Sequence, residues 1–214
     1  MKEKELKRLT NLKANEEKLY ESKKVKFICG IDEAGRGPLA GPVVVGAVIM
    51  PRESMIEGVN DSKKISESKR EMLYEKITSE AISYSVGIID HKVIDDINIL
   101  NATKLAVTTA LKELAVKPDV ILVDALTGID TLGIPYISEI KGDAKEYSIS
   151  AASIIAKVTR DRIMREWDEV YPAYGFAKHK GYGTAFHIQA IKENGLCQIH
   201  RRSFIKDDWI PKDK

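Results

Sequence analysis

The acidic residues that could do chemistry in this chain stand at the ends of apolar segments. Asp32 and Glu33 directly follow the apolar segment 27–31, and Asp124 ends the apolar run DVILVD. Two adjacent carboxylates repel each other unless a cation lies between them. Burying an unpaired acid is costly, so we expect each of these residues at a site or beside a cation. Solvated loop acids are the ordinary alternative for the first pair.

Asp161 is a fourth candidate. It lies in a predicted helix over residues 144–167, on a small polar face at spacings of three and four residues. That face consists of Ser150, Ser153, Lys157 and Asp161. The alternative is a Lys157–Asp161 surface pair worth about 0.3–0.5 kcal/mol. If Asp161 belongs to a site, Lys157 orients its carboxylate. In a surface pair, Lys157 only neutralises the charge of Asp161.

Carboxylates of this kind are the ligands that Mg²⁺ and Mn²⁺ prefer. Two such ions about 4 Å apart would clamp the attacking water and the leaving oxygen of a phosphodiester. The two cysteines, Cys29 and Cys197, have the spacing neither of a zinc site nor of a disulfide framework. The acids predict a metal site provided that their three chain segments converge.

A glycine-rich loop, GRGPLAGP, follows the first acid pair. A nucleotide-binding turn must open a helix, and Pro38 and Pro42 prevent one here. The segment Gly35–Gly37 is therefore expected to offer backbone N–H groups that approach a sugar or phosphate closely, with Arg36 as a cation. An ordinary hairpin connection is the alternative.

Basic and aromatic residues gather near the C-terminus. Between residues 178 and 206, six Lys and Arg residues stand against one Glu, whereas the whole chain carries only +2. Tyr182 lies among them. Lys and Arg that meet phosphates, with aromatics packed on sugar or base, are typical of nucleic-acid grooves. Lys63 and Lys64 of the segment NDSKK could add phosphate contacts, although aromatic residues belong more often to a core.

The elements expected to position these residues are strands that come first and then alternate with helices. Strands are predicted over residues 25–31, 43–50, 83–89, 119–124 and 136–140. Helices are predicted from residue 66, from a cap at Asn101, over residues 144–167, and from a cap at Thr184 to Gly195. This order predicts an α/β fold with a mixed β-sheet flanked by helices and a helical C-terminal part.

The chain has 214 residues and is 43% hydrophobic, which suits one α/β domain with a proper core. Residues 1–24, with Leu6, Leu9 and Leu12 at helical spacing, predict an amphipathic helical extension that docks on the body or reaches toward a polyanion. A frayed leader is the alternative. We expect residues 25–206 to form the catalytic domain with a C-terminal substrate-binding region, and residues 207–214 a tail.

The composition also excludes several classes of protein. A formal charge of +2 argues against a basic packaging protein. The longest apolar run, Val43–Met50, is far shorter than the ~20 residues of a membrane span, and the charged N-terminus lacks the apolar core of a secretory signal. With two isolated cysteines, the sequence indicates a cytoplasmic protein without a membrane partner, which we take to be a monomer.

Six segments occur in a fixed order: GIDEAGRGPLAGPVV, NDSKK, ILVDA, SISAASIIAKVTRD, HKGYGT and HRRSF. Through them the chain resembles bacterial ribonuclease HII, a type 2 ribonuclease H, over residues 27–204. The resemblance implies a ribonuclease-H-like fold and metal-dependent cleavage of the RNA strand of RNA–DNA hybrids. It also implies incision 5′ of single ribonucleotides embedded in duplex DNA, which leaves 3′-hydroxyl and 5′-phosphate ends.

The resemblance assigns roles by position. The carboxylates that hold two Mn²⁺ or Mg²⁺ ions would be Asp32, Glu33, Asp124 and Asp161. The expected substrate-binding residues are Gly35, Arg36, Gly37, Tyr182, Lys63, Lys64 and Lys157. Among these, the glycine loop would read the 2′-hydroxyl and Tyr182 would pack on the following deoxyribose. Ala125 and Leu126 stand where many members have Gly-Asn, which puts the loop contacts after the third acid in question.

Three alternatives stand beside this interpretation. The related ribonuclease HIII type carries a large N-terminal domain, and only 24 residues precede the first predicted strand. A catalytically silent nucleic-acid-binding protein could keep the fold. A glycine-loop nucleotide binder conflicts with the prolines. His187 and His200 either assist product release or pack structurally.

Overall fold

The computed structural model describes residues 2–21 and 24–211. Residues 1, 22 and 23 of the expected extension, and residues 212–214 of the expected tail, lie outside the described residues. A five-stranded sheet has the order β3-β2-β1-β4-β5. Its strands are β1 (Ile28–Ala34), β2 (Val43–Ile49), β3 (Ser83–Ile89), β4 (Val120–Asp124) and β5 (Tyr136–Glu139). The first three pair antiparallel, and β4 and β5 run parallel to β1, so the sheet is mixed as predicted.

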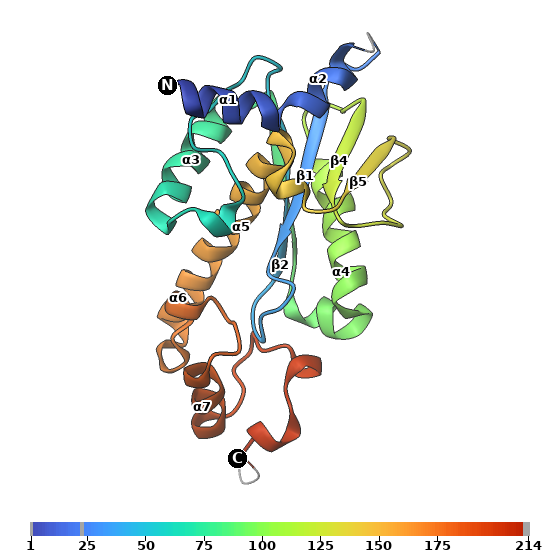
Figure 1. Cartoon of the computed structure of the whole chain (residues 1–214). Helices are drawn as coiled ribbons and strands as arrows, with labels where there is room; N and C mark the ends of the chain where they lie inside the picture. The colour runs from blue at the N-terminus through green and yellow to red at the C-terminus, as the bar shows by residue number, and fades with distance from the viewer. Residues whose placement is uncertain (1, 22–23, 212–214) are drawn as a thin grey trace.

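Helices cover both faces of the sheet, which Figure 1 shows nearly edge-on between α5 and α4. One face carries α5 (Tyr147–Val170), with α3 (Glu67–Glu80), α1 (Glu3–Leu12) and α2 (Ala14–Glu21) packed around it. The other carries α4 (His91–Glu113). Beyond the far end of α5 lie α6 (Phe176–His179) and α7 (Ala185–Asn194). The 3-10 turns are η1 (Ser62–Lys64), η2 (Gly142–Ala144), η3 (Pro172–Tyr174), η4 (Arg202–Phe204) and η5 (Asp207–Trp209).

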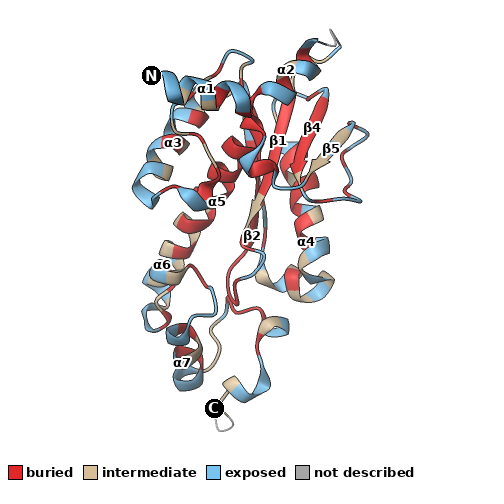
Figure 2. Cartoon of the chain, in the orientation of Figure 1, coloured by how far each residue is buried: buried red, intermediate tan, exposed pale blue. Residues whose placement is uncertain are grey.

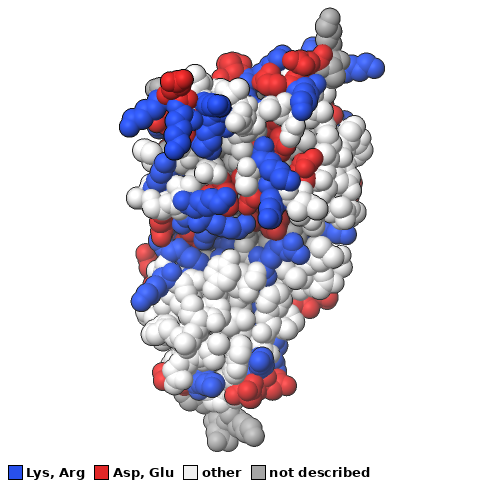
Figure 3. All heavy atoms as spheres, viewed as in Figure 1, with Lys and Arg blue, Asp and Glu red and all other residues white. Residues whose placement is uncertain are grey.

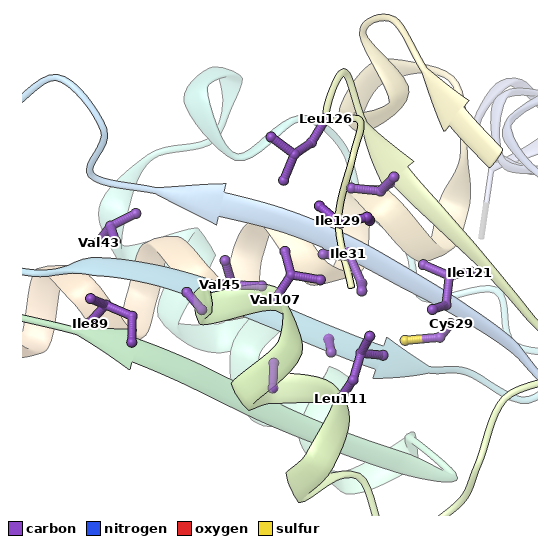
Figure 4. Close-up of a cluster of buried hydrophobic side chains, with 14 of the residues drawn as sticks. Cys29, Ile31, Val43, Val45, Ile89, Val107, Leu111, Ile121, Leu126 and Ile129 are labelled. Carbon is purple, nitrogen blue, oxygen red and sulfur yellow. The ribbon is translucent and has the colours of Figure 1, made fainter. Parts of the chain in front are cut away.

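Apolar residues are buried on both faces of the central strands, as the red centre of Figure 2 shows. Between the sheet and α4, Val107 and Leu111 lie over Val45 and Cys29 (Figure 4). β4 is buried along its apolar length, as expected of a strand covered on both sides. Burial of this kind stabilises the fold by about 25 cal/mol for each Å² of apolar surface removed from water.

The helix α5 begins in direct backbone contact with the sheet. A Cβ atom at Gly30 would lie 2.1 Å from the carbonyl carbon of Ser148, so only glycine lets the first turn of α5 cross β1 this closely. The same approach sets η2, which precedes α5, beside the end of β4. This packing determines which side chains meet the acids of β1 and β4.

The N-terminal helices α1 and α2 are fastened to the body by apolar and polar contacts. Leu9 and Leu12 of α1 are buried in the core beneath α5. From α2, the buried carboxylate of Glu16 accepts a hydrogen bond from the Ser148 N–H at 2.7 Å, at the start of α5. Lys13, between the two helices, donates to the Ser54 carbonyl at 2.9 Å. These contacts hold the described residues 2–21 of the segment against the body.

Several boundaries differ from the sequence prediction by one to three residues, among them the helix predicted over 144–167, which is α5 (Tyr147–Val170). Two differences bear on the site and on α4. β1 continues through Asp32 and Glu33, which pair with β2, so these acids lie within a strand rather than after it. Asn101 does not cap a helix: α4 begins at His91 and is interrupted at Asn98 (φ +66°), whose side chain accepts from the Asn101 N–H at 3.1 Å. Val93, Ile94 and Ile97 pack on the core from the turns before the break at Asn98, which the sequence prediction left out.

Candidate active site

Asp32, Glu33 and Asp124 meet where the central strands β1 and β4 end. The two strands are parallel and Ile31 pairs with Val123, so the next residues, Asp32 and Asp124, lie at the same level. Asp32 is only 5% exposed, and its Oδ1 accepts a hydrogen bond from the Glu33 N–H at 2.8 Å. Three of the four predicted acids therefore lie close together, which the sequence alone left open.

The environment of these acids disfavours their negative charge. Burial raises the pKa of Asp32 well above its usual range, and the charges of Glu33, Asp124 and Asp143 raise it further. Burial also raises the pKa of Glu33, against the opposing effect of Arg36. For Asp124, burial raises the pKa more than the hydrogen bond from the Gly142 N–H, at 2.7 Å, lowers it. Concentrated buried negative charge of this kind calls for cations.

Asp143 is a member of this group that the sequence analysis missed. It lies in η2, is 6% exposed, and its charge raises the pKa of both Asp32 and Asp124. Its carboxylate is 3.2 Å from the Lys63 ammonium group. In the sequence, only its position soon after the strand β5, which pairs in parallel with β4, pointed to Asp143 as a site residue. The segment Lys141-Gly142-Asp143 otherwise has the composition of an ordinary turn.

Asp161 lies in a different setting. It is 2% exposed, its Oδ1 is 2.5 Å from Lys157 Nζ and its Oδ2 is 3.6 Å from Arg70 Nη2. The pair with Lys157 is therefore largely buried rather than a surface pair. The charges that act most on Asp32 come from Glu33, Asp124 and Asp143. The structure accordingly places Asp143, rather than Asp161, with the acids of β1 and β4.

The donor set fits a hard divalent cation, because it consists of carboxylate oxygens whose negative charge is under-compensated. Within residues 2–21 and 24–211, no group of three His, Cys, Asp or Glu side chains is already arranged to hold a metal ion. The cations beside the acids are Lys63, near Asp143, and Arg36, 3.5 Å from Glu33. Ion binding there would have to release these two pairs.

A hollow in the surface beside Glu33 brings together most of the predicted substrate-binding residues. It is lined by Glu33, Ala34, the Gly35–Gly37 loop, Ser62, Lys63, Lys157 and Tyr182. Tyr182 is 45% exposed at this hollow, and Cε1 of its ring would be 3.7 Å from a Cβ at Gly37. Lys64 does not line it: its ammonium group is 3.4 Å from Asp61, and it lines a separate hollow next to α1.

Two buried arginines hold the glycine loop from below. Arg201 donates to the carbonyls of Gly35, at 2.6 Å, and Arg36, at 3.0 Å. Arg160 donates to the Pro42 carbonyl at 2.9 Å. Gly35 has φ +96°, and a Cβ there would lie 2.0 Å from Arg160 Nε, so glycine is required. Burial lowers the pKa of Arg160 to about 10 and that of Arg201 to about 9.

This arrangement corrects the expectation for the basic C-terminal segment. Arg201 is fully buried and Lys180 is 7% exposed, so two of its six cations are internal. Arg160 donates to the Lys180 carbonyl at 2.9 Å, which ties the segment before Tyr182 to the glycine loop. Counting charge along the sequence did not distinguish these residues from surface cations, because burial depends on tertiary contacts.

A buried histidine pair holds Tyr182. The Cys197 N–H donates to His200 Nδ1 at 2.9 Å, so the His200 proton resides on Nε2, which lies 3.0 Å from His187 Nε2. His187 must accept there, and its Nδ1 donates to the Tyr182 carbonyl at 3.0 Å. Burial lowers the pKa of both imidazoles to about 4. Of the two roles left open, the geometry supports structural packing.

A five-stranded mixed sheet in this order, with buried acids at the ends of its central strands, defines the protein as a nuclease of the ribonuclease-H-like fold. The chain matches the family model described as ribonuclease HII over residues 29–209. The chain belongs to the ribonuclease HII family. The resemblance and the fold predicted from the six segments are confirmed.

Individual relatives support this assignment. The chain is 56% identical over 205 residues to ribonuclease HII of Acetivibrio thermocellus, an alignment that covers 96% of this chain and 79% of that protein. It is 51% identical over 212 residues to ribonuclease HII of Clostridioides difficile, covering 94% and 82%. The protein is therefore an endonuclease that hydrolyses the RNA strand of RNA–DNA hybrids.

Two solved structures share the fold. Ribonuclease H2 from Pyrococcus horikoshii matches with a TM-score of 0.69 and 33% identity, over 83% of this chain and 93% of that one. The ribonuclease HII in a complex with PCNA from Archaeoglobus fulgidus matches with a TM-score of 0.71 and 28% identity, over 85% and 96%. Within the described residues, no helix has the length and apolar character needed to cross a membrane.

Proposed function

We propose that this protein also incises duplex DNA on the 5′ side of single embedded ribonucleotides and leaves 3′-hydroxyl and 5′-phosphate ends. Two divalent ions, Mn²⁺ or Mg²⁺, would be held by the carboxylates of Asp32, Glu33, Asp124 and Asp143. The observation that carries the proposal is the single hollow shared by Glu33, the glycine loop and Tyr182. We include in the proposal that the enzyme acts in the cytoplasm as a monomer.

The metal part of the proposal rests on the acids. Their burial and mutual repulsion raise the pKa of Asp32, Glu33 and Asp124, and bound cations would relieve that repulsion. When bound, the ions supply Lewis-acid activation of the attacking water and stabilise the departing 3′-oxygen. Asp143 takes the fourth position here because Lys157 and Arg70 already neutralise Asp161.

The glycine loop is oriented to read the 2′-hydroxyl. In a trans peptide unit the N–H points away from the C=O. Because the carbonyls of Gly35 and Arg36 are directed at the buried Arg201, the N–H groups of Arg36 and Gly37 point away from it. A 2′-hydroxyl can donate and accept hydrogen bonds, and deoxyribose lacks this group. The flat ring of Tyr182, next to Gly37, is available for the following sugar.

The acids are tested by four single substitutions: Asp32→Asn, Asp124→Asn, Asp143→Asn and Asp161→Asn. Cleavage is measured in Mg²⁺ and in Mn²⁺, and duplex binding is measured in chelator. We expect the first three variants to lose activity by about 100-fold or more while they keep duplex binding. Asp161→Asn should retain more activity than Asp143→Asn. The opposite ranking would return the fourth position to Asp161, and normal turnover by Asp32→Asn or Asp124→Asn would refute its assigned role.

A further inference from the structure

A basic surface lies beside the active-site hollow, at the N-terminal helix α1. Three adjoining hollows lie along α1, and Arg8 lines all three. The other cations that line them are Lys2, Lys4, Lys7, Lys64, Lys69 and Lys145. The acids among the lining residues are Glu5 and Glu57. We call these lining residues the α1 surface. In Figure 3, Lys and Arg gather over α1 and continue toward the centre of the face.

Two cations of α1, Lys4 and Lys7, are exposed, whereas Arg8 is half-buried and pairs with Glu5 at 2.7 Å. Lys4, Lys7, Arg8 and Asn11 follow the i, i+3, i+4, i+7 pattern of one helix face, and all four line the same hollow. An adjoining face buries Leu9 and Leu12, and Leu12 also lines one of the hollows. The helix α1 therefore packs against the body through its apolar side chains, and its exposed lysines remain available to a ligand.

The α1 surface is held in place next to the catalytic loop. Arg8 donates to the Val59 carbonyl at 2.7 Å, and Glu5 accepts from the Gly58 N–H at 2.9 Å. Residues 58 and 59 lead directly into η1, whose Lys63 lines the active-site hollow and whose Lys64 lines the α1 hollow. The two basic regions thus adjoin at η1.

We propose that the α1 surface binds the sugar–phosphate backbone of the duplex that flanks the cleavage site. The inference rests on the proposed function, because a duplex seated in the active-site hollow must continue past it. The ten residues of α1 span about 15 Å, the length of about four base pairs. Cations spaced along such a surface contact phosphates without reading sequence. The helix lies outside residues 29–209, so it would extend the footprint of the family's catalytic domain.

The test compares two double variants. Lys4→Gln with Lys7→Gln removes two exposed cations of α1 and keeps good helix formers. Lys112→Gln with Lys117→Gln removes two exposed lysines at and just beyond the end of α4, on the opposite face of the sheet. Each pair is placed in the Asp32→Asn background, and binding to a 24-base-pair duplex with one embedded ribonucleotide is titrated in chelator at several salt concentrations.

We expect the α1 variant to bind roughly tenfold more weakly at 0.1 M salt, with a slope of log K against log salt smaller by about 2. The α4 control should match the parent. In the active background, the α1 variant should raise KM with kcat unchanged on the long duplex, and it should leave cleavage of a duplex truncated close to the scissile bond unaltered.

Equal slopes for the α1 variant, the control and the parent would overturn the proposal. The proposal would also be overturned if the α1 variant kept its duplex affinity but lost binding of polyglutamate. The α1 surface would then bind an acidic protein partner. Since binding is read in chelator without turnover, an enzyme that fails to incise at single ribonucleotides refutes the proposed function and leaves this measurement interpretable.

Discussion

The substitution Arg201→Met tests how the glycine loop is held. Within the described residues, neither Arg201 nor Arg160 is part of an ion pair, although both are buried. Arg201 instead donates four hydrogen bonds to main-chain carbonyls. These carbonyls belong to Gly35, Arg36, Gly41 and Pro42. Methionine keeps much of the apolar stem and removes every one of these donors.

The cost follows from the carbonyls left behind. The Pro42 carbonyl keeps its hydrogen bond from Arg160, so three acceptors lose their donor. A buried acceptor without a partner costs about 1–3 kcal/mol, so three of them at the low end give about 3 kcal/mol. Removal of the buried guanidinium charge offsets part of this loss, whereas hydrogen bonds from a charged donor are the stronger kind, worth about 1.5–3 kcal/mol each. We therefore expect Arg201→Met to lower the free energy of unfolding by about 3–5 kcal/mol. Arg201→Lys keeps the charge without the planar fork and should lose less.

The stability assay is urea unfolding at pH 7. Cleavage of a duplex carrying one ribonucleotide is measured separately without urea, at a temperature where both proteins are folded. The adjacent Arg202 is the matched control, because its side chain is 55% exposed and pairs with the exposed Asp207. Arg202→Met should cost less than about 1 kcal/mol. An equal, small loss for both variants, with cleavage unchanged, would refute the claim that Arg201 holds the loop.

Three further predictions concern single side chains. Ala125 has φ +42°, so Ala125→Gly should raise the free energy of unfolding by about 1 kcal/mol in urea, and a loss of stability would contradict the strain. Burial raises the pKa of Glu16 to about 7, so its folded state holds the proton more tightly than the unfolded state. The free energy of unfolding should therefore fall by about 3 kcal/mol as pH rises from 4.5 to 7. Glu16→Gln, which keeps an acceptor for the Ser148 N–H, should remove this pH dependence. If the variant kept the wild-type pH profile, Glu16 would not be its source. His187→Leu should raise KM on the junction substrate, whereas His187→Asn, which can still donate to the Tyr182 carbonyl, should restore it; equal KM values for the two variants would exclude the positioning role.

The sequence predicted best the elements whose signals are local. The strand Ser83–Ile89 alternates buried and exposed residues, and its bounds agree with the prediction. Thr184 caps α7 as expected, accepting from the His187 N–H at 3.2 Å. Acids that end apolar runs are visible in sequence, and the parallel pairing of β1 with β4 is what brings Asp32 beside Asp124.

Residues whose role depends on tertiary contacts were not predictable in this way. Asp143 reaches the site because Gly30 lets α5 cross β1 closely and because β5 pairs in parallel with β4. Arg201 looks like a surface cation in sequence, and only the folded chain surrounds it with carbonyls. Asp161 shares a helix face with Lys157, yet the side chain that completes its neutralisation, Arg70, comes from α3.

The most direct test of the account is a cleavage assay on three matched duplexes: all DNA, DNA with one embedded ribonucleotide, and an RNA–DNA hybrid. Each is incubated with Mg²⁺, Mn²⁺ or chelator. We predict a metal-dependent nick on the 5′ side of the ribonucleotide, cleavage of the hybrid, and an untouched DNA duplex. Cleavage of the hybrid alone would contradict the junction-reading roles of Gly35–Gly37 and Tyr182. No cleavage in either metal, with duplex binding retained, would indicate a silent nucleic-acid-binding protein and contradict the central claim.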